Sequence, residues 1–486
     1  MIPVAGQILR QADRQPDKTA LTDGRITLTY AQLRSAILIN VQRLKSLNVG
    51  YGDRVMIVAD RQPGFVPLYL ACHLSGAVTV PLPADIAPSR YAFIKKKVNP
   101  RLIIGFTDPD ISTLALSAFA SGDEAEVKAE PTSCDCPELP DLSDLAEILF
   151  TTGTTGEPKG VLLSQQNLAA SVRNIGEFIG NTTDDIELLV LPLSHSFGLN
   201  RLRCALSNGQ TLVLSGGLGN VKRLFRLMQE FQVTGLGLVP SGWAMLHHLS
   251  GDKIAQFKDQ LRYLELGSSA MELADKQELM RLLPHTRICM HYGLTEASRS
   301  AFIEFHTEKA FLDTAGRPSP HTQITIRDEQ GTVLPCDTLG EICVEGESVT
   351  SGYLDLPREG SFWGRAFRTG DLGRLDAQGY LTFYSRKKEL INVGGEKVSP
   401  LEVEEVLRSL DFVQDCACVP TPDPRGILSE VVKAFIVTDR PELITFESID
   451  PLIGNRLEGY KHPALYAVTD KIPRTSSGKI QRRLLT

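Results

Sequence analysis

The segment LFTTGTTGEPKGVLLS, residues 149–164, sets ten residues of Thr, Gly, Glu, Pro and Lys between two apolar runs. These runs, AEILF before the polar residues and VLLS after them, have the composition of strands, so a turn between two strands is predicted. Such a turn binds phosphate when glycines and small side chains let backbone N–H groups point at phosphate oxygens. The residues that would serve this role are Thr151, Thr152, Gly153, Thr154, Thr155, Gly156 and Lys159.

The predicted turn differs from a Walker A phosphate loop. That loop requires Gly-Lys followed by Ser or Thr, whereas Lys159 lies between Pro158 and Gly160. The run after it is strand-like, so no contribution from a helix dipole is expected. The pattern excludes a P-loop phosphotransferase. Taken alone, the segment leaves a Thr- and Gly-rich surface turn as the alternative.

Three later segments also carry residues suited to a nucleotide. HYGLTEAS (291–298) follows an apolar run and presents Glu296, and a carboxylate beside a triphosphate is a natural Mg²⁺ ligand. FRTGDLG (367–373) presents Asp371 between glycines, where it could accept hydrogen bonds from ribose hydroxyls. RTSSGKIQRR (474–483) presents Lys479 in a polar stretch. Each feature alone is common in solvated loops, so the prediction rests on their combination.

The composition is that of an ordinary globular protein, with 42% hydrophobic and 22% charged residues. A net charge of −7 argues against a nucleic-acid partner. The most apolar stretch, residues 65–83, is interrupted by prolines and a glycine, which favours a buried helix and strand over a membrane span. The N-terminus lacks a secretory pattern and the nine cysteines are scattered, so a cytoplasmic location is expected. Nothing completes a metal site around the closest pair, Cys134 and Cys136.

Short apolar runs alternate with segments of helical period, which predicts an α/β fold. Residues 30–47 are predicted to form a helix and residues 53–60 a buried strand. Residues 121–144 are polar and are predicted to form a surface connection. Ser399, Pro400 and Glu402 form a capping-box arrangement that starts a helix in a smaller α+β lobe. Two domains are therefore expected, residues 1–384 and 385–486.

Taken in order, these segments resemble the superfamily of adenylate-forming enzymes, which includes acyl-CoA synthetases, adenylation domains of peptide synthetases, and luciferases. The resemblance runs from LTYAQLRSA (28–36) to Lys479, nearly the whole chain. It passes through TTGTTGEPKG, LPLSHSFGL (191–199), LELGSSA (264–270), HYGLTEAS, GEICVEGESVTSGY (340–353), FRTGDLG, SRKKELINVGGEKVSPLEVEEVL (385–407) and PRTSSGKIQRR. The order and the spacing of so many motifs make the resemblance specific.

The resemblance implies a two-step reaction. A carboxylate attacks the α-phosphate of ATP to give an acyl-adenylate and pyrophosphate, and a nucleophile, most often a thiol, then displaces AMP. ATP and Mg²⁺ are the implied cofactors, with Glu296 as the metal ligand and Lys479 bridging the substrate carboxylate and the α-phosphate. By similarity, Gly267, Ser268, Ser269, Tyr292 and Gly293 lie around the adenine, Thr295 reaches the α-phosphate, and Asp371 and Arg386 bind the ribose.

In this superfamily the small C-terminal lobe rotates between the two half-reactions. SRKK (385–388) resembles the hinge motif and implies a pivot at Lys388. The expected fold is therefore a large N-terminal domain of sheets with flanking helices plus a small mobile α+β C-terminal lobe. Two positions depart from the pattern: Ser385 replaces the usual first glycine of the hinge motif, and Lys397 stands where some relatives have a nucleotide-contacting Arg.

The acid pocket is expected near residues 191–206, 239–246 and the turns that carry Ser268 and Glu296. Amino-acid-activating relatives commonly carry an Asp in the first segment, but HSFGL has none, so the chain resembles acyl-CoA and acyl-carrier ligases more closely. His195 is expected to gate the pocket or assist thiol entry, with packing at a turn as the alternative. The pocket candidates are Phe197, Gly198, Trp243 and Arg299, of which Trp243 is equally expected in the core.

Arg201 and Arg203 follow the apolar turn that carries these pocket candidates. They could pair with a second substrate carboxylate. However, residues two apart on a helix point in different directions, so contacts with solvent or with neighbouring acids are favoured for them.

The predicted activity is that of an AMP-forming acid–thiol ligase acting on a small carboxylic acid. The thiol belongs to CoA or to the phosphopantetheine arm of an acyl carrier protein, which the motifs leave open. Adenylation of an amino acid and amide formation with an amine acceptor remain alternatives. A non-catalytic nucleotide-binding relative is the hypothesis from another class. Lys159, Glu296, Asp371 and Lys479 are all present, which argues against that hypothesis.

Overall fold

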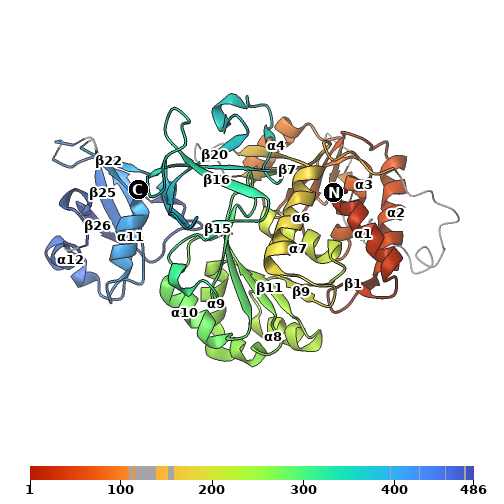
Figure 1. The fold of residues 1–486 in the computed structure, drawn as a ribbon, viewed down its shortest axis with the longest axis horizontal. Coiled ribbons are helices and arrows are strands. Elements are labelled where there is room, and N and C mark those ends of the chain that lie inside the picture. Colours follow the sequence, from red (N-terminus) through yellow and green to blue (C-terminus); the bar gives the residue numbers. More distant parts are fainter. Residues whose placement is uncertain are drawn as a thin grey trace. The chain divides into compact units, whose positions relative to one another are not determined.

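A computed structural model describes residues 1–108, 113–114, 138–151, 158–394, 396–425, 427–428, 430–454, 456–475 and 478–485. The protein divides into two compact units, residues 1–324 with 344–367, and residues 325–343 with 368–486. The first is large and built of sheets and helices, and the second is smaller and mixed α and β, which confirms the predicted fold class (Figure 1). The expected domain boundary between residues 384 and 385 marks where the C-terminal lobe is predicted to rotate, and it stays a prediction.

The larger sheet of the first unit is mainly parallel. Nine described strands lie in the order β15-β14-β13-β12-β11-β9-β10-β1-β2. Their bounds are β1 (Thr19–Thr22), β2 (Thr27–Thr29), β9 (Ile186–Leu189), β10 (Thr211–Leu214), β11 (Gly235–Leu238), β12 (Tyr263–Leu266), β13 (Arg287–Tyr292), β14 (Ala301–Glu304) and β15 (Arg317–Pro318). Strands β9 to β13 pair in parallel, so their carboxyl ends share one edge, where ligands bind in open α/β sheets.

The second sheet of the first unit carries the predicted phosphate-binding turn. Seven described strands lie in the order β18-β8-β7-β4-β3-β5-β6. Their bounds are β3 (Arg54–Val58), β4 (Val78–Leu82), β5 (Leu102–Ile104), β6 (Thr113–Leu114), β7 (Leu145–Thr151), β8 (Lys159–Ser164) and β18 (Gly352–Tyr353). Strands β7 and β8 pair antiparallel with Thr151 opposite Lys159, which confirms the predicted position between two strands.

Helices pack between and around these sheets. Their bounds are α1 (Val4–Arg14), α2 (Tyr30–Ser46), α3 (Phe65–Leu74), α4 (Pro88–Val98), α6 (Gln165–Ile179), α7 (Ser196–Ser207), α8 (Val221–Glu230), α9 (Pro240–Ser250) and α10 (Leu273–Leu282). Helix α6 packs on β8, α7 packs on β9 and β10, and both contact α1, so these helices link the two sheets (Figure 1). All ten residues of α3 are buried, as expected for a helix that is apolar on every face.

The second unit has its own core. Strands β24 (Asp415–Thr421), β25 (Val431–Val437) and β26 (Leu465–Val468) form a sheet, next to helices α11 (Pro400–Arg408) and α12 (Phe446–Ile453). The short strands β22 (Ile391–Val393) and β23 (Glu396–Val398) pair with each other. Ser399 caps α11 by accepting a hydrogen bond from the Glu402 backbone N–H. The Glu402 side chain binds Tyr384 and Lys461, so the reciprocal half of the predicted capping box is missing.

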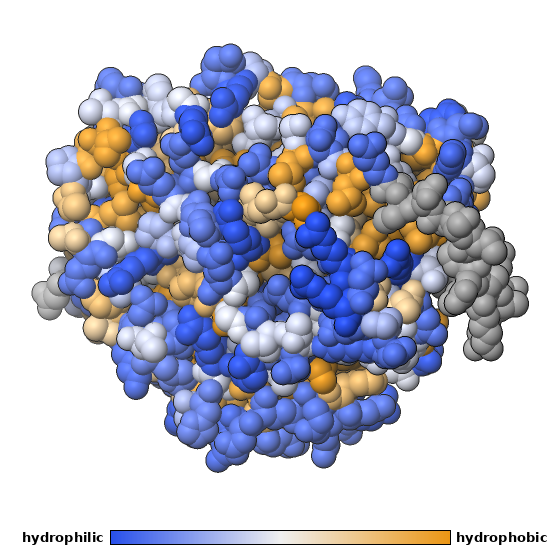
Figure 2. Space-filling model, turned by 45° about the vertical axis from the view of Figure 1, so that its right-hand side comes forward, coloured by the Kyte–Doolittle hydropathy of each residue, from blue (hydrophilic) through white to orange (hydrophobic). Residues whose placement is uncertain are grey.

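Five more strands form another sheet: β16 (Thr322–Arg327), β17 (Gly340–Gly346), β19 (Phe362–Trp363), β20 (Ala366–Leu375) and β21 (Leu381–Arg386). Hydrophilic residues predominate on the face drawn in Figure 2, with hydrophobic ones interspersed. In the described ranges no helix has the length and hydropathy needed to cross a bilayer. Every cysteine in those ranges is a free thiol; Cys134 and Cys136 lie outside them.

Candidate active site

The predicted phosphate-binding turn starts at Thr151, the last residue of β7, and ends at Lys159, the first residue of β8. Five of its predicted contact residues lie outside the described residues: Thr152, Gly153, Thr154, Thr155 and Gly156. The start of β8 is tightly packed, because a Cβ on Gly160 would lie 3.2 Å from Leu354 Cβ. Binding of phosphate by this turn stays a prediction.

Glu296, the predicted metal ligand, is only 9% exposed. The Tyr353 hydroxyl donates a hydrogen bond of 2.7 Å to Glu296 Oε1. Among the described residues, Glu296 has no cationic partner, although a carboxylate this buried is ordinarily paired with a cation. Mg²⁺ favours one or two carboxylates together with phosphate oxygens. The site therefore fits a divalent cation held by Glu296.

Tyr353 joins Glu296 to the predicted phosphate-binding turn, and the sequence analysis missed it. The Lys159 ammonium lies 4.8 Å from the centroid of the Tyr353 ring, within cation–π range. Burial and the adjacent charge of Glu296 raise the pKa of Tyr353 well above its ordinary value, so its hydroxyl remains a donor. Tyr353 lies at the end of the quoted motif GEICVEGESVTSGY, but nothing local to that motif indicates its partners.

The predicted adenine-binding residues follow two neighbouring parallel strands. Gly267, Ser268 and Ser269 come directly after β12, while Tyr292 ends β13 and Gly293 follows it. Both turns are tightly packed: a Cβ on Gly267 would lie 2.1 Å from the His291 ring, and one on Gly293 would lie 2.6 Å from Arg299 N. Ser268 has a φ of 84°, which L side chains rarely adopt. The geometry brings these residues and the Thr295–Glu296 turn to one edge of the sheet.

The predicted acid-pocket segment forms the N-terminal turn of α7. His195 is the N-cap residue, and a Cβ on Gly198 would lie 2.2 Å from the Pro192 carbonyl oxygen, so only glycine fits there. Phe197 is buried, and its ring meets His291 edge-on at 4.7 Å between ring centroids. Arg299 lies over the other side of this segment, with its Cζ 4.7 Å from the Phe197 ring centroid.

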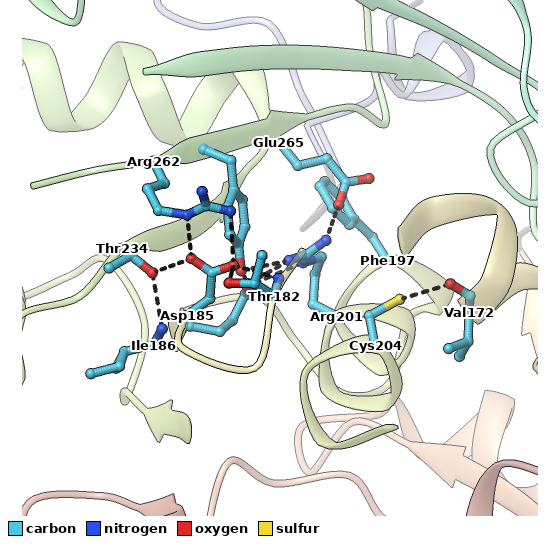
Figure 3. A network of polar contacts seen from close by, with 12 residues as sticks. Val172, Thr182, Asp185, Ile186, Phe197, Arg201, Cys204, Thr234, Arg262 and Glu265 are labelled. Atoms are coloured by element: carbon cyan, nitrogen blue, oxygen red, sulfur yellow. Dashed lines mark hydrogen bonds and ion pairs between the residues drawn. The ribbon is translucent and has the colours of Figure 1, made fainter. Parts of the chain in front are cut away.

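Beyond this turn, α7 carries two arginines that are completely buried. Arg201 pairs with Glu187. It also pairs with Glu265 at 3.0 Å, as Figure 3 shows. Arg203 pairs with Glu147 at 3.1 Å. The predicted contacts with neighbouring acids are thus confirmed for both arginines. The alternative prediction, that they contact solvent, is wrong because both side chains are buried. The three glutamates were not singled out from the sequence, although each interrupts an apolar strand.

Two glycines of β11 lie between the strands that carry the acidic partners of Arg201. Glu187 on β9 and Tyr263 on β12 both lie opposite Gly235, and Glu265 lies opposite Gly237. A Cβ on Gly235 would lie 2.0 Å from Tyr263 Cζ, and one on Gly237 would lie 3.5 Å from Arg201 Cγ. Gly235 therefore leaves room for the Tyr263 ring, whereas a Cβ on Gly237 would make only ordinary contact with Arg201. The Arg201 guanidinium reaches Glu187 and Glu265 on the strands on either side of β11.

Glu265 is the centre of this buried cluster. It contacts Arg201 Nη1 and Arg299 Nε, each at 3.0 Å. His291 Nδ1 lies 2.8 Å from its Oε1, in an orientation outside hydrogen-bond geometry. Burial alone would raise the pKa of Glu265, but Arg299 and Arg201 hold it well below its ordinary value. Glu265 is therefore ionised at neutral pH.

Two of the predicted pocket residues, Trp243 and Arg299, are almost completely buried among protein partners. Trp243 is fully buried in the core of the first unit and stacks on His247 at 5.0 Å, which favours the core interpretation. Arg299 bonds Glu265, Ser298 and the Phe197 carbonyl oxygen. A substrate anion at Arg299 would have to replace one of these partners.

The second unit holds the remaining predicted residues. Asp371 on β20 lies directly opposite Arg386 on β21, with 3.4 Å between Asp371 Oδ1 and Arg386 Nε. Lys388 follows the end of β21 by two residues. The backbone of Lys479 is held by Thr475, whose N–H donates to the Lys479 carbonyl at 2.8 Å. The roles of these four residues stay predictions.

The predicted nucleotide-binding residues at the carboxyl edge of a mainly parallel sheet, together with a smaller second unit that carries a lysine near its end, are the arrangement expected of adenylate-forming enzymes. Residues 8–354 match the AMP-binding enzyme family, and residues 402–479 match the AMP-binding enzyme C-terminal domain. The chain belongs to the AMP-binding enzyme family. This membership confirms the predicted superfamily.

Curated relatives and solved structures agree with this assignment. A feruloyl-CoA synthase from an Amycolatopsis species is 30% identical over 97% of this chain and 96% of its own length. A 2-succinylbenzoate–CoA ligase from Bacillus velezensis is 30% identical over 98% and 96%. The o-succinylbenzoate CoA synthetase from Bacillus subtilis, solved with its acyl-adenylate intermediate, is 26% identical, with a TM-score of 0.87 over 99% of this chain and 97% of that one. The predicted class, an AMP-forming acid–thiol ligase, is confirmed.

Proposed function

We propose that this enzyme adenylates a small carboxylic acid that carries no α-ammonium group and transfers the acyl group to the thiol of CoA. The relatives named above are CoA ligases and synthetases of carboxylic acids, which supports CoA as the acceptor. A phosphopantetheine arm on an acyl carrier protein presents the same thiol and is the second acceptor to test. Free thiols at every described cysteine support a reducing, cytoplasmic setting.

One observation carries the choice of acid. A substrate ammonium needs an unpaired carboxylate, and residues 191–203 contain neither Asp nor Glu. The buried glutamates around α7 are already paired: Glu265 with Arg201 and Arg299, Glu187 with Arg201, and Glu147 with Arg203. Releasing Glu265 or Glu147 to bind an ammonium would leave the buried guanidinium of Arg299 or Arg203 without its acidic partner, and releasing Glu187 would remove one of the two partners of Arg201. Such a loss of buried counter-charge is costly. A carboxylic acid whose remaining groups are neutral or anionic avoids that cost.

The first step concentrates negative charge on phosphate oxygens, so cations and N–H donors must converge on them. In this proposal the turn at 151–160, with Lys159, holds the β- and γ-phosphates and Thr295 reaches the α-phosphate. Lys479 positions the substrate carboxylate against the α-phosphate, two anions that otherwise repel each other. Asp371 and Arg386 hold the ribose. Magnesium held by Glu296 would offset charge on the phosphates, as expected from the B. subtilis synthetase solved with ATP and magnesium.

The second step needs a thiol and a route to the acyl-adenylate. His195, at the N-cap of α7, is assigned to this step, where it gates the pocket or assists thiol entry. Lys388 is assigned as the pivot of the C-terminal lobe between the two steps. Both assignments rest on the resemblance of the surrounding motifs.

The test is acid-dependent ATP–pyrophosphate exchange without thiol, over fatty, hydroxy, aryl and dicarboxylic acids and amino acids. We expect one class of acid to give exchange, and Lys479→Ala to lower it roughly a hundredfold or more, as for loss of a preorganised charge donor. Lys471→Ala, an exposed lysine eight residues away, is the control and should retain full exchange. Exchange with amino acids alone would overturn the proposed acid, and no exchange with any acid despite ATP binding would favour a non-catalytic role.

A further inference from the structure

Residues 349–354 connect two parts of the predicted nucleotide site within the first unit. At one end, Ala297 forms a β-bridge with Val349, and the Thr350 N–H donates to the Glu296 carbonyl at 2.8 Å. At the other end, β18 pairs with β8, placing Gly352 opposite Leu162 and Tyr353 opposite Val161. This connecting segment therefore fixes the backbone of the metal carboxylate relative to the strand that begins at Lys159.

Side chains repeat this connection at the site itself. The Tyr353 hydroxyl donates to Glu296 Oε1 at 2.7 Å, while the Tyr353 ring lies beneath the Lys159 ammonium at 4.8 Å. The ring is half-buried and meets Phe367 edge-on at 6.4 Å, which limits its rotation. Oε1 of Glu296 thus accepts a hydrogen bond from the Tyr353 hydroxyl. Among the residues described, no side chain donates to Oε2.

We propose that Tyr353 is a positioning residue that holds the Glu296 carboxylate ready for a divalent cation and the Lys159 ammonium ready for phosphate. The proposal rests on the function proposed above, because it concerns the same nucleotide site. A donor on one carboxylate oxygen fixes the orientation of a ligand, and removal of such partners typically costs ten- to a hundredfold in metal affinity. The ring contributes separately through the cation–π contact with Lys159.

Two substitutions separate these contributions. Tyr353→Phe removes only the hydroxyl and keeps the ring under Lys159, whereas Tyr353→Leu removes both. Tyr51→Phe is the matched control, because the Tyr51 hydroxyl also donates to a carboxylate, Asp144 at 2.6 Å, at an exposed position away from these residues. Thermal unfolding without ligand checks that each variant folds.

The measurement is the equilibrium dissociation constant of ATP, with magnesium and with EDTA, in the absence of any acid. For Tyr353→Phe we expect the gain in ATP affinity from magnesium to fall roughly tenfold, while the dissociation constant measured in EDTA stays unchanged. For Tyr353→Leu the dissociation constant in EDTA should also rise, by about two- to fivefold. In a Glu296→Gln background, Tyr353→Phe should change the magnesium gain little, because the two residues act as one unit.

Either of two outcomes would overturn the proposal. One is a Tyr353→Phe enzyme with the full magnesium gain. The other is an equal loss with and without magnesium, which would point to general damage to the site. Should Tyr353→Phe unfold, the Glu296→Gln enzyme decides. If magnesium still raises its ATP affinity in full, Glu296 does not hold the cation and the proposed role of Tyr353 is overturned. If that gain is lost, the result supports a cation site at the carboxylate that Tyr353 orients. ATP binding needs no acid, so failure of the proposed function would show as absent exchange with these binding results intact.

Discussion

Replacing Glu265 by glutamine should destabilise the first unit by about 3 kcal/mol, the lower end of the cost of breaking a buried ion pair. The substitution removes the charge that two buried guanidiniums share, those of Arg201 and Arg299, each 3.0 Å from the carboxylate. Arg201 keeps Glu187, but among the described residues Arg299 keeps only neutral hydrogen-bond partners, Ser298 and the Phe197 carbonyl. The lower end applies because the amide oxygen can still accept one hydrogen bond.

Urea unfolding followed by tryptophan fluorescence measures this effect. The chain has two tryptophans, Trp243 and Trp363, and both belong to the first unit, so the signal reports on that unit. The midpoint should fall while the slope stays constant. Glu278→Gln, which removes a partly exposed carboxylate paired with the exposed Arg281, is the control and should leave the midpoint nearly unchanged. A loss below about 1 kcal/mol for Glu265→Gln would refute a charge-dependent cluster.

The pH dependence gives an independent check. The pKa of Glu265 is depressed in the folded protein, so its stabilising effect is present above the ordinary value near 4.5 and is lost as pH falls below it. The Glu265→Gln enzyme should therefore lose less stability than the wild type between neutral pH and acid below 4.5. Identical acid slopes for the two proteins would contradict the assignment.

Two further predictions concern the pocket turn and the second unit. Gly198→Ala should raise the KM for the acid in the exchange assay and lower thermal stability, because the new Cβ would lie 2.2 Å from the Pro192 carbonyl oxygen; an unchanged KM would show that the turn adapts freely. Arg482→Ala should destabilise the second unit by about 3 kcal/mol, because the buried carboxylate of Glu404 would keep Arg408 as its one cationic partner among the described residues. The effect should appear as faster amide exchange in β24 and β25. Unchanged exchange there would argue against that buried pair.

Local patterns in the sequence predicted much of the first unit. The helical period of residues 30–47 is α2, and the apolar run 53–60 is β3. The interrupted apolar stretch 65–83 is a buried helix followed by a buried strand, α3 and β4. These predictions succeed because each depends on side chains a few positions apart.

Contacts between residues far apart in the chain could not be predicted from the sequence. Tyr353 donates to a carboxylate 57 positions earlier, and no spacing rule links the two. The carboxylate partners of Arg201 and Arg203 left a faint signal, since Glu147, Glu187 and Glu265 each interrupt an apolar strand. A charge in such a strand predicts a buried partner, but the partner's identity depends on how strands and helices are arranged.

The buried charge pairs of Arg201 carry a consequence for how the predicted acid pocket can change over evolution. Arg201 ties α7 to Glu187 and Glu265 on the strands on both sides of β11, and a side chain at 235 would collide with the Tyr263 ring that lies in the same cluster. Helix α7 cannot shift along the sheet to widen or shorten the predicted pocket without separating these buried charges. Acceptance of new acids should therefore arise by exchange of side chains in the turn before Arg201, one residue at a time, on an anchored helix.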